Sequence, residues 1–201
     1  DDISDKSWVE VLPQMTRGTY GVEGLREKVD AGIPVFWIKQ ENENWVKNNP
    51  EIALNIQTET YKYPSVNIIG KIEGTDPQLK KEYVLLSGHQ DHDGIRHPVK
   101  NDTIYNGADD NASGVSAVLQ IAKAFQASGQ QPERNIIFAF WDGEELGLLG
   151  SEYFAANCSF ISSIRGYLNF DMIGRNKDEA QPKHVVYFYT ESYPVFGEWL
   201  K

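Results

Sequence analysis

The clearest indication of the architecture is residues 83–92, Tyr83-Val84-Leu85-Leu86-Ser87-Gly88-His89-Gln90-Asp91-His92, where an apolar run leads into polar side chains. Such a nearly continuous run is typical of a strand buried on both faces of a sheet. Asn135 to Trp141 has the same character and is followed by Asp142-Gly143-Glu144-Glu145. Tyr167 to Phe170 is likewise followed by Asp171. Three predicted strands therefore end in polar clusters.

Helical patterns alternate with these strands. A first helix is predicted from an N-cap at Ser113 to about Ala127, because its apolar residues recur every three or four positions. A second helix is predicted over Leu148 to Ala156, and two more strands over Val66 to Glu73 and Val185 to Tyr189. This order predicts an α/β fold, a three-layer sandwich with a mainly parallel central mixed sheet flanked by helices.

The first sixty residues give weaker signals. Ile33 to Ile38 is a short apolar run that suits a strand, and Glu41 to Asn49 suits a helix. Ile52 to Tyr61 alternates apolar and polar residues, as a half-buried strand does.

The composition narrows the function classes. Acidic residues outnumber basic ones by 29 to 19, for a formal charge of −10, so nucleic acid is not an expected partner. No apolar run approaches the roughly 18 residues of a membrane span, so membrane insertion is not expected. The single cysteine rules out a cysteine-based zinc cluster. Any bound metal must therefore be held by His, Asp and Glu.

The polar clusters are expected to meet, because the carboxyl ends of parallel strands share one sheet edge. A fourth cluster, Gly107 to Gly114, opens the first predicted helix. Burying a histidine and several carboxylates together is costly unless cations compensate. Asp110, Glu145 and Asp171 with one hydroxide would balance two Zn²⁺, and a carboxylate can bridge two such ions. His89 suits zinc, and Asp91 is placed to orient its ring without touching the metal.

Four motifs in this order resemble metallopeptidase family 28, the co-catalytic zinc aminopeptidases. They are His-x-Asp at His89, Gly-Ala-x-Asp-Asn-x-Ser-Gly at Gly107, Gly-Glu-Glu-x-Gly-Leu-x-Gly-Ser at Gly143, and Asn-x-Asp-Met-Ile-Gly-Arg at Asn169. The resemblance runs from about Tyr63 to Arg175. Each motif is short, but the ordered set is specific.

The resemblance implies a role for each matching position. His89 and Asp171 would hold one Zn²⁺, Glu145 the other, and Asp110 would bridge both. Glu144 would be the general base that takes a proton from the attacking water. The bond between Asp110 and Asn111 is expected to be cis. The substrates implied are peptides with a free N-terminus.

One ligand of the family pattern has no match. It is a second histidine several tens of residues beyond the position of Asp171, and the sequence continues for only 30 residues after that position. His184 is the only later histidine, and no family motif surrounds it. We therefore expect the second zinc site to be incomplete and the domain to lack its C-terminal part.

The resemblance also suggests a domain division. Residues 61–201 would be the zinc peptidase catalytic domain. Residues 1–60 would be an N-terminal segment that could be a remnant of a protease-associated insert domain. Gly32 to Ile38 resembles the closing part of such a domain, and an independent edge strand is the alternative for that run. The family favours a secreted or periplasmic location, although no signal peptide is visible in Asp1 to Asp5.

Other readings remain open at this point. A glutaminyl cyclase-like acyltransferase and a carboxypeptidase of acidic peptides could use the same scaffold. A receptor-like interaction domain without catalysis is a third alternative, but every ligand expected up to Asp171 is present. Asp109 is expected in a loop or supporting role. His92 and His97 are expected to line the mouth of the cleft, with no role assigned.

Overall fold

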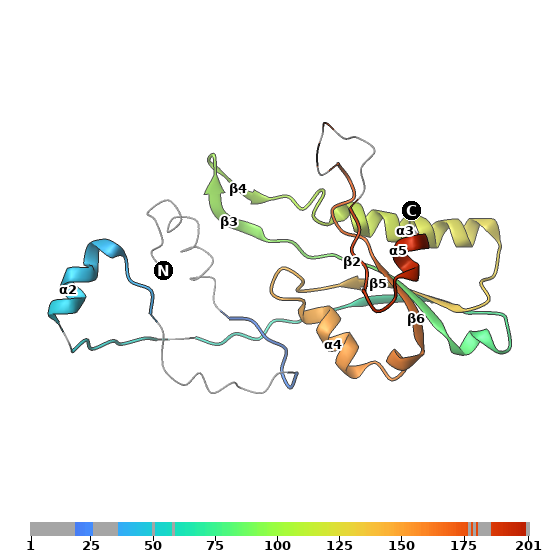
Figure 1. Ribbon diagram of the computed structural model, residues 1–201, viewed down its shortest axis with the longest axis horizontal. Coiled ribbons are helices and arrows are strands. Elements are labelled where there is room, and N and C mark those ends of the chain that lie inside the picture. The colour runs from blue at the N-terminus through green and yellow to red at the C-terminus, as the bar shows by residue number, and fades with distance from the viewer. Residues whose placement is uncertain are drawn as a thin grey trace.

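Figure 1 shows the computed structural model, which describes residues 19–25, 36–49, 51–57, 59–176, 178, 180 and 186–199. An α/β body contains the strands and the two longest helices. The described residues before it include one turn of 3-10 helix, η1 (Gln40–Asn42), and the short helix α2 (Glu43–Asn48). This part of the chain extends away from the α/β body (Figure 1). No helix among the described residues is both long enough and apolar enough to cross a membrane.

The central sheet has four strands in the order β1-β5-β2-β6. They are β1 (Ile68–Ile72), β2 (Tyr83–His89), β5 (Asn135–Trp141) and β6 (Ile164–Asn169). Strand β2 pairs in parallel with β5 and β6, whereas β1 runs antiparallel to β5. The expected mainly parallel mixed sheet is therefore confirmed.

Helices cover the two faces of this sheet, as Figure 1 shows. Alternate residues of β5 point to opposite sides. On one side, Phe138 and its neighbours pack against Val118 of α3 (Ala112–Ser128). On the other, Trp141 packs against Phe154 of α4 (Leu149–Asn157). Both faces of β5 are apolar because each is buried beneath a helix, and the predicted three-layer sandwich is confirmed.

The amino ends of the three parallel strands are tied together by one carboxylate. Glu82, directly before β2, accepts a hydrogen bond from Arg134 Nε at 2.8 Å and another from Arg165 Nε at 2.9 Å. Arg134 lies directly before β5, and Arg165 lies in β6. The two arginines hold the pKa of the Glu82 carboxyl below its usual range. This pairing lies at the end of the sheet opposite the polar clusters.

The remaining elements are short. A second sheet is the hairpin of β3 (Gly94–Val99) and β4 (Asp102–Tyr105), which the sequence did not predict. Two further 3-10 turns, η2 (Leu79–Lys81) and η3 (Ile161–Ser163), precede β2 and β6, and α5 (Val195–Trp199) lies near the end of the described chain.

Some expected elements are wrong. The described part of Ile52 to Tyr61 forms no strand, because its apolar side chains are exposed and have no partner strand. Residues 186–189 and 36–38 are also irregular, while residues 185 and 33–35 lie outside the described residues. The cap of α3 is Asn111 rather than Ser113, since the Asn111 side chain accepts the amide of Gly114.

Candidate active site

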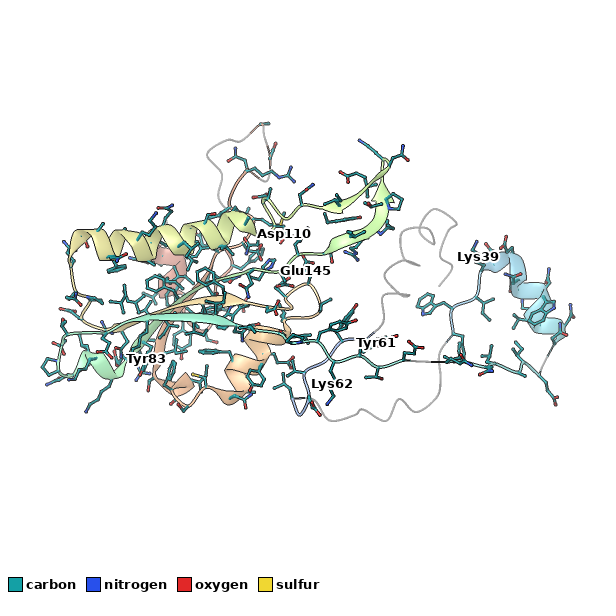
Figure 2. The ribbon with its side chains drawn as sticks, turned by 180° about the vertical axis from the view of Figure 1, so that it is seen from behind. Lys39, Tyr61, Lys62, Tyr83, Asp110 and Glu145 are labelled. Atoms are coloured by element: carbon teal, nitrogen blue, oxygen red, sulfur yellow. The ribbon has the colours of Figure 1, made fainter. Side chains whose placement is uncertain are left out.

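The register of the sheet brings the polar clusters to one edge. In β2, His89 is paired with Trp141 of β5, and Ser87 is paired with Asn169 of β6. The loops that leave these strands therefore start side by side. The first turn of α3 meets the same edge, so Asp110 lies close to Glu145, while Tyr83 lies at the far end of the sheet (Figure 2).

His89 is at the centre of this edge and only 2 % of its surface is exposed. Its Nδ1 lies 3.0 Å from the carbonyl oxygen of Asp91. A carbonyl can only accept, so Nδ1 carries a proton. In the neutral ring the lone pair is therefore on Nε2, whereas the protonated ring carries a proton on both nitrogens. Nε2 lies 3.1 Å from Asp110 Oδ1, 3.7 Å from Asp171 Oδ2 and 4.0 Å from Glu144 Oε2. Three carboxylates thus surround one imidazole nitrogen.

Asp91 supports the site with both its backbone and its side chain. Its carbonyl, rather than its carboxylate, makes the hydrogen bond to the His89 ring; the carboxylate lies 3.8 Å from Nδ1. The carboxylate oxygens accept the backbone amides of Glu144 at 3.0 Å and Glu145 at 3.2 Å. Asp91 therefore positions the His89 ring and the turn that carries both glutamates.

Asn111 joins the start of α3 to the loop after β6. It is buried, its Nδ2 donates to the carbonyl of Phe170 at 2.9 Å, and its Oδ1 accepts the amides of Gly114 and Met172. The Asp110–Asn111 peptide bond is cis, as the resemblance implied. The two segments pack so closely that a Cβ at Gly114 would lie 2.1 Å from the Phe170 oxygen.

Asp109 has the supporting position that the sequence predicted. Its Oδ1 accepts the amide of Gly174 at 2.7 Å, and its Oδ2 lies 3.3 Å from Arg175 Nε. Its carbonyl accepts the hydroxyl of Ser113, whose oxygen in turn accepts the amide of Ile173. Asp109 thus holds the loop that follows Asp171.

The crowding of charge shifts several pKa values. Burial raises the pKa of the Glu144 carboxyl, and the charges of Glu145, Asp171 and Asp91 raise it further against the opposing effect of His89. Burial also raises the pKa of Asp171, with Asp110 adding to the shift.

For His89, burial lowers the pKa, but the Asp91 carboxylate beside the ring, the hydrogen bond to the Asp91 carbonyl and the charges of Glu144 and Asp171 outweigh it and raise the value to about 9. The site attracts positive charge, which a cation or a proton can supply.

The donor atoms fit divalent cations of the zinc type. Within the described residues, two groups of three side chains each offer ligand atoms within 4.8 Å of one another. The groups are His89, Glu144 and Asp171, and His92, Asp110 and Glu145. Each has one imidazole and two carboxylates, a set of donors that zinc accepts. All five predicted site residues, His89, Asp110, Glu144, Glu145 and Asp171, are therefore brought together.

The geometry also shows what the sequence missed. His92 lies against Glu145 with 2.5 Å between Nδ1 and Oε1, although no role was assigned to it. Its only sequence signal was its place three residues after His89 in a strand-end cluster. His184, the alternative late histidine, lies outside the described residues.

An open cleft of about 570 Å³ adjoins the site. His92 and His97 line it, as expected, together with Arg96. Against this one arginine, the lining includes four acidic residues, Asp91, Asp93, Asp142 and Glu145. The cleft is thus suited to a cationic group beside the cluster of ligands.

Comparison with known proteins gives several related peptidases. The chain is 43% identical over 125 residues to leupeptin-inactivating enzyme 1 of Streptomyces exfoliatus, which covers 60% of this chain and 24% of that protein. It is 33% identical over 135 residues to the probable leucine aminopeptidase 2 of Aspergillus oryzae, covering 66% of this chain and 23% of that protein. The chain therefore spans about a quarter of the length of these relatives.

One further relative and one solved structure are also similar to this chain. The probable glutamate carboxypeptidase of Arthroderma benhamiae is 36% identical over 123 residues, covering 59% of this chain and 15% of that protein. Among solved structures, a zinc aminopeptidase from Bacillus subtilis is 27% identical, with a TM-score of 0.42 over 54% of this chain and 24% of that one.

The family model of peptidase family M28 matches residues 67–193. This range includes all four sequence motifs and every residue of the site described above. It also covers well over half of the 201 residues. The chain belongs to peptidase family M28.

Proposed function

We propose that the full-length protein is a zinc-dependent exopeptidase that hydrolyses residues from the N-termini of peptides. The observation that supports this best is the buried His89, whose Nε2 faces the carboxylates of Asp110, Asp171 and Glu144 at the carboxyl edge of the sheet. Membership of a peptidase family and relatives named aminopeptidases point the same way. We expect a secreted or periplasmic protein, as the resemblance implies.

The proposed ligands follow the family pattern. His89 and Asp171 would hold one Zn²⁺, Glu145 the other, and Asp110 both. Asp110 suits the shared role because its Oδ1 is 3.1 Å from His89 Nε2 and it also belongs to the group that contains Glu145. When bound, zinc supplies Lewis-acid chemistry, polarising a scissile carbonyl and making water a better nucleophile.

Glu144 is proposed as the general base. The raised pKa of its carboxyl, caused by burial and by its acidic neighbours, makes Glu144 a better proton acceptor than an ordinary carboxylate. Its backbone amide is held by Asp91, so its carboxylate starts from a defined position. The structure also groups Glu144 with His89 and Asp171, which makes a ligand role the competing assignment.

Replacing Glu144 by Gln in the full-length protein separates these two assignments. If Glu144 is the general base, Glu144→Gln should keep its zinc content while its turnover falls about 10²- to 10⁴-fold. Zinc content measured by mass spectrometry and release of free amino acids from a peptide provide the two readouts. Glu133→Gln, an exposed surface change, is the matched control and should keep both. Loss of zinc in Glu144→Gln would make Glu144 a ligand, and near-normal turnover would exclude it as the base.

The site favours an aminopeptidase over a carboxypeptidase, which the relative from Arthroderma benhamiae keeps open as a second candidate. The acidic lining of the cleft suits the positive charge of a free peptide N-terminus and repels a terminal carboxylate. A peptide pair, one acetylated at its N-terminus and one amidated at its C-terminus, tests this directly. We expect cleavage of the amidated peptide only; cleavage of the acetylated peptide only would reverse the assignment.

A further inference from the structure

The position of His92 brings a second imidazole into the site. His92 follows β2, and its Nδ1 lies 2.5 Å from Glu145 Oε1. About four-fifths of each of these side chains is buried, with 21% of His92 and 19% of Glu145 exposed. The contact is therefore part of the site rather than a pair on the open surface.

Both partners are held in place by other segments. Gly107, which has a φ of +67°, approaches His92 so closely that a Cβ there would lie 3.0 Å from the Cβ of His92. The ring of Tyr105 lies 6.4 Å from the His92 ring, centroid to centroid. The Glu145 amide is anchored by the Asp91 carboxylate. The packing thus keeps the imidazole beside Glu145.

Asp110 completes the group. Ligand atoms of His92, Asp110 and Glu145 all lie within 4.8 Å of one another, so one cation could contact all three. One imidazole and two carboxylates also make the donor set found in catalytic zinc sites with an open position. A simple ion pair between His92 and Glu145 would not need Asp110 at this distance.

We propose that His92 is a ligand of the second zinc ion, with Nδ1 as the coordinating atom. This inference rests on the proposed zinc site and replaces the expectation that only Asp110 and Glu145 serve the second position in this sequence. With His92 included, the chain supplies three ligands to each of two positions, and Asp110 is common to both. His89 would then be the histidine ligand of one ion, and His92 that of the other.

Zinc binding by the 201-residue chain tests the proposal. We expect two zinc ions per chain by mass spectrometry after equilibrium dialysis, and one in His92→Ala. In calorimetry the second ion should bind about 100-fold more weakly to that variant, since loss of a partner to a ligand alone already costs 10- to 100-fold. His97→Ala is the matched control, because His97 lies in the adjacent β3, lines the same cleft and should leave two ions bound.

A spectroscopic measurement on the unmodified chain covers the case in which His92→Ala fails to fold. In ¹⁵N-labelled chain, zinc should move the Nδ1 resonance of His92 to the range of metal-bound imidazole. An unmoved resonance would overturn the proposal, as would two ions bound with unchanged affinity in His92→Ala. A chain that binds no zinc at all would refute the proposed zinc site itself, whereas zinc held through His89 without His92 would refute this inference alone.

Discussion

Replacing Asn111 by Ala should destabilise the fold and the site together. The change removes the cap of α3, which is worth about 1 kcal/mol. It also leaves the Phe170 carbonyl without the hydrogen bond that Asn111 Nδ2 donates at 2.9 Å, and an orphaned buried group costs about 1–3 kcal/mol. Because Asn111 is only 2 % exposed, water does not readily replace these bonds. We expect the free energy of unfolding to fall by about 3 kcal/mol.

Urea unfolding followed by the fluorescence of the buried Trp141 measures this loss. Asn157→Ala is the matched control, because Asn157 Nδ2 donates to the backbone carbonyl of Tyr153 on the exposed surface of α4. Loss of this hydrogen bond should cost under about 0.5 kcal/mol. Zinc affinity should also fall in Asn111→Ala, since Asn111 joins the segments of Asp110 and Asp171. A loss of stability below about 1 kcal/mol would refute the reasoning that Asn111 ties the start of α3 to the loop after β6.

Two other perturbations act on the charges of the site. In the metal-free chain, protonated His89 has a pKa raised to about 9, so its contribution is present below about pH 6.5 and lost as the pH rises through 9. The free energy of unfolding should thus fall by at most about 3 kcal/mol between pH 6 and 10. Thermal melts in EDTA in which the Tm rises over this pH range would contradict the prediction. Asp91→Ala should weaken zinc binding about 10- to 100-fold by releasing His89 and the turn of Glu144, measured by calorimetry; unchanged affinity would exclude that positioning role.

The sheet and its reactive edge could be predicted because burial leaves a plain mark on the sequence. Strand β5 is covered on both faces, so Ile136 to Trp141 is an unbroken apolar run. The residues at the carboxyl ends of parallel strands must then meet, so the sequence alone predicts that His89, Glu145 and Asp171 lie at one edge of the sheet, where the structure has them.

The wrong secondary-structure predictions fall in segments that no helix or strand of the described chain covers. Among the described residues, no strand pairs with the alternating segment Ile52 to Tyr61. Strand β3 is largely exposed, contains Pro98 and shows no alternation of apolar and polar residues, so the sequence does not predict the hairpin. Asn111 and Ser113 are both good capping residues two positions apart, and only the packing against Phe170 selects Asn111. The approach of His92 to Glu145 depends on the path of a loop, which no periodicity encodes.

The pairing of Glu82 with Arg134 and Arg165 lies at one end of the three parallel strands, and the candidate active site lies at the other. Contacts that hold the strands together and residues that carry the chemistry are thus partly separated in space. The ion pairs add to the strand pairing at one end of the sheet, and the seven residues of β2 separate them from the site at the other end. Residues that line the cleft without making the supporting contacts of Asp91, Asp109 or Asn111 can therefore vary without changing the pairing at the other end of the sheet. A scaffold with this division can acquire new specificities through its loops, because a change at the reactive edge need not be compensated in the core.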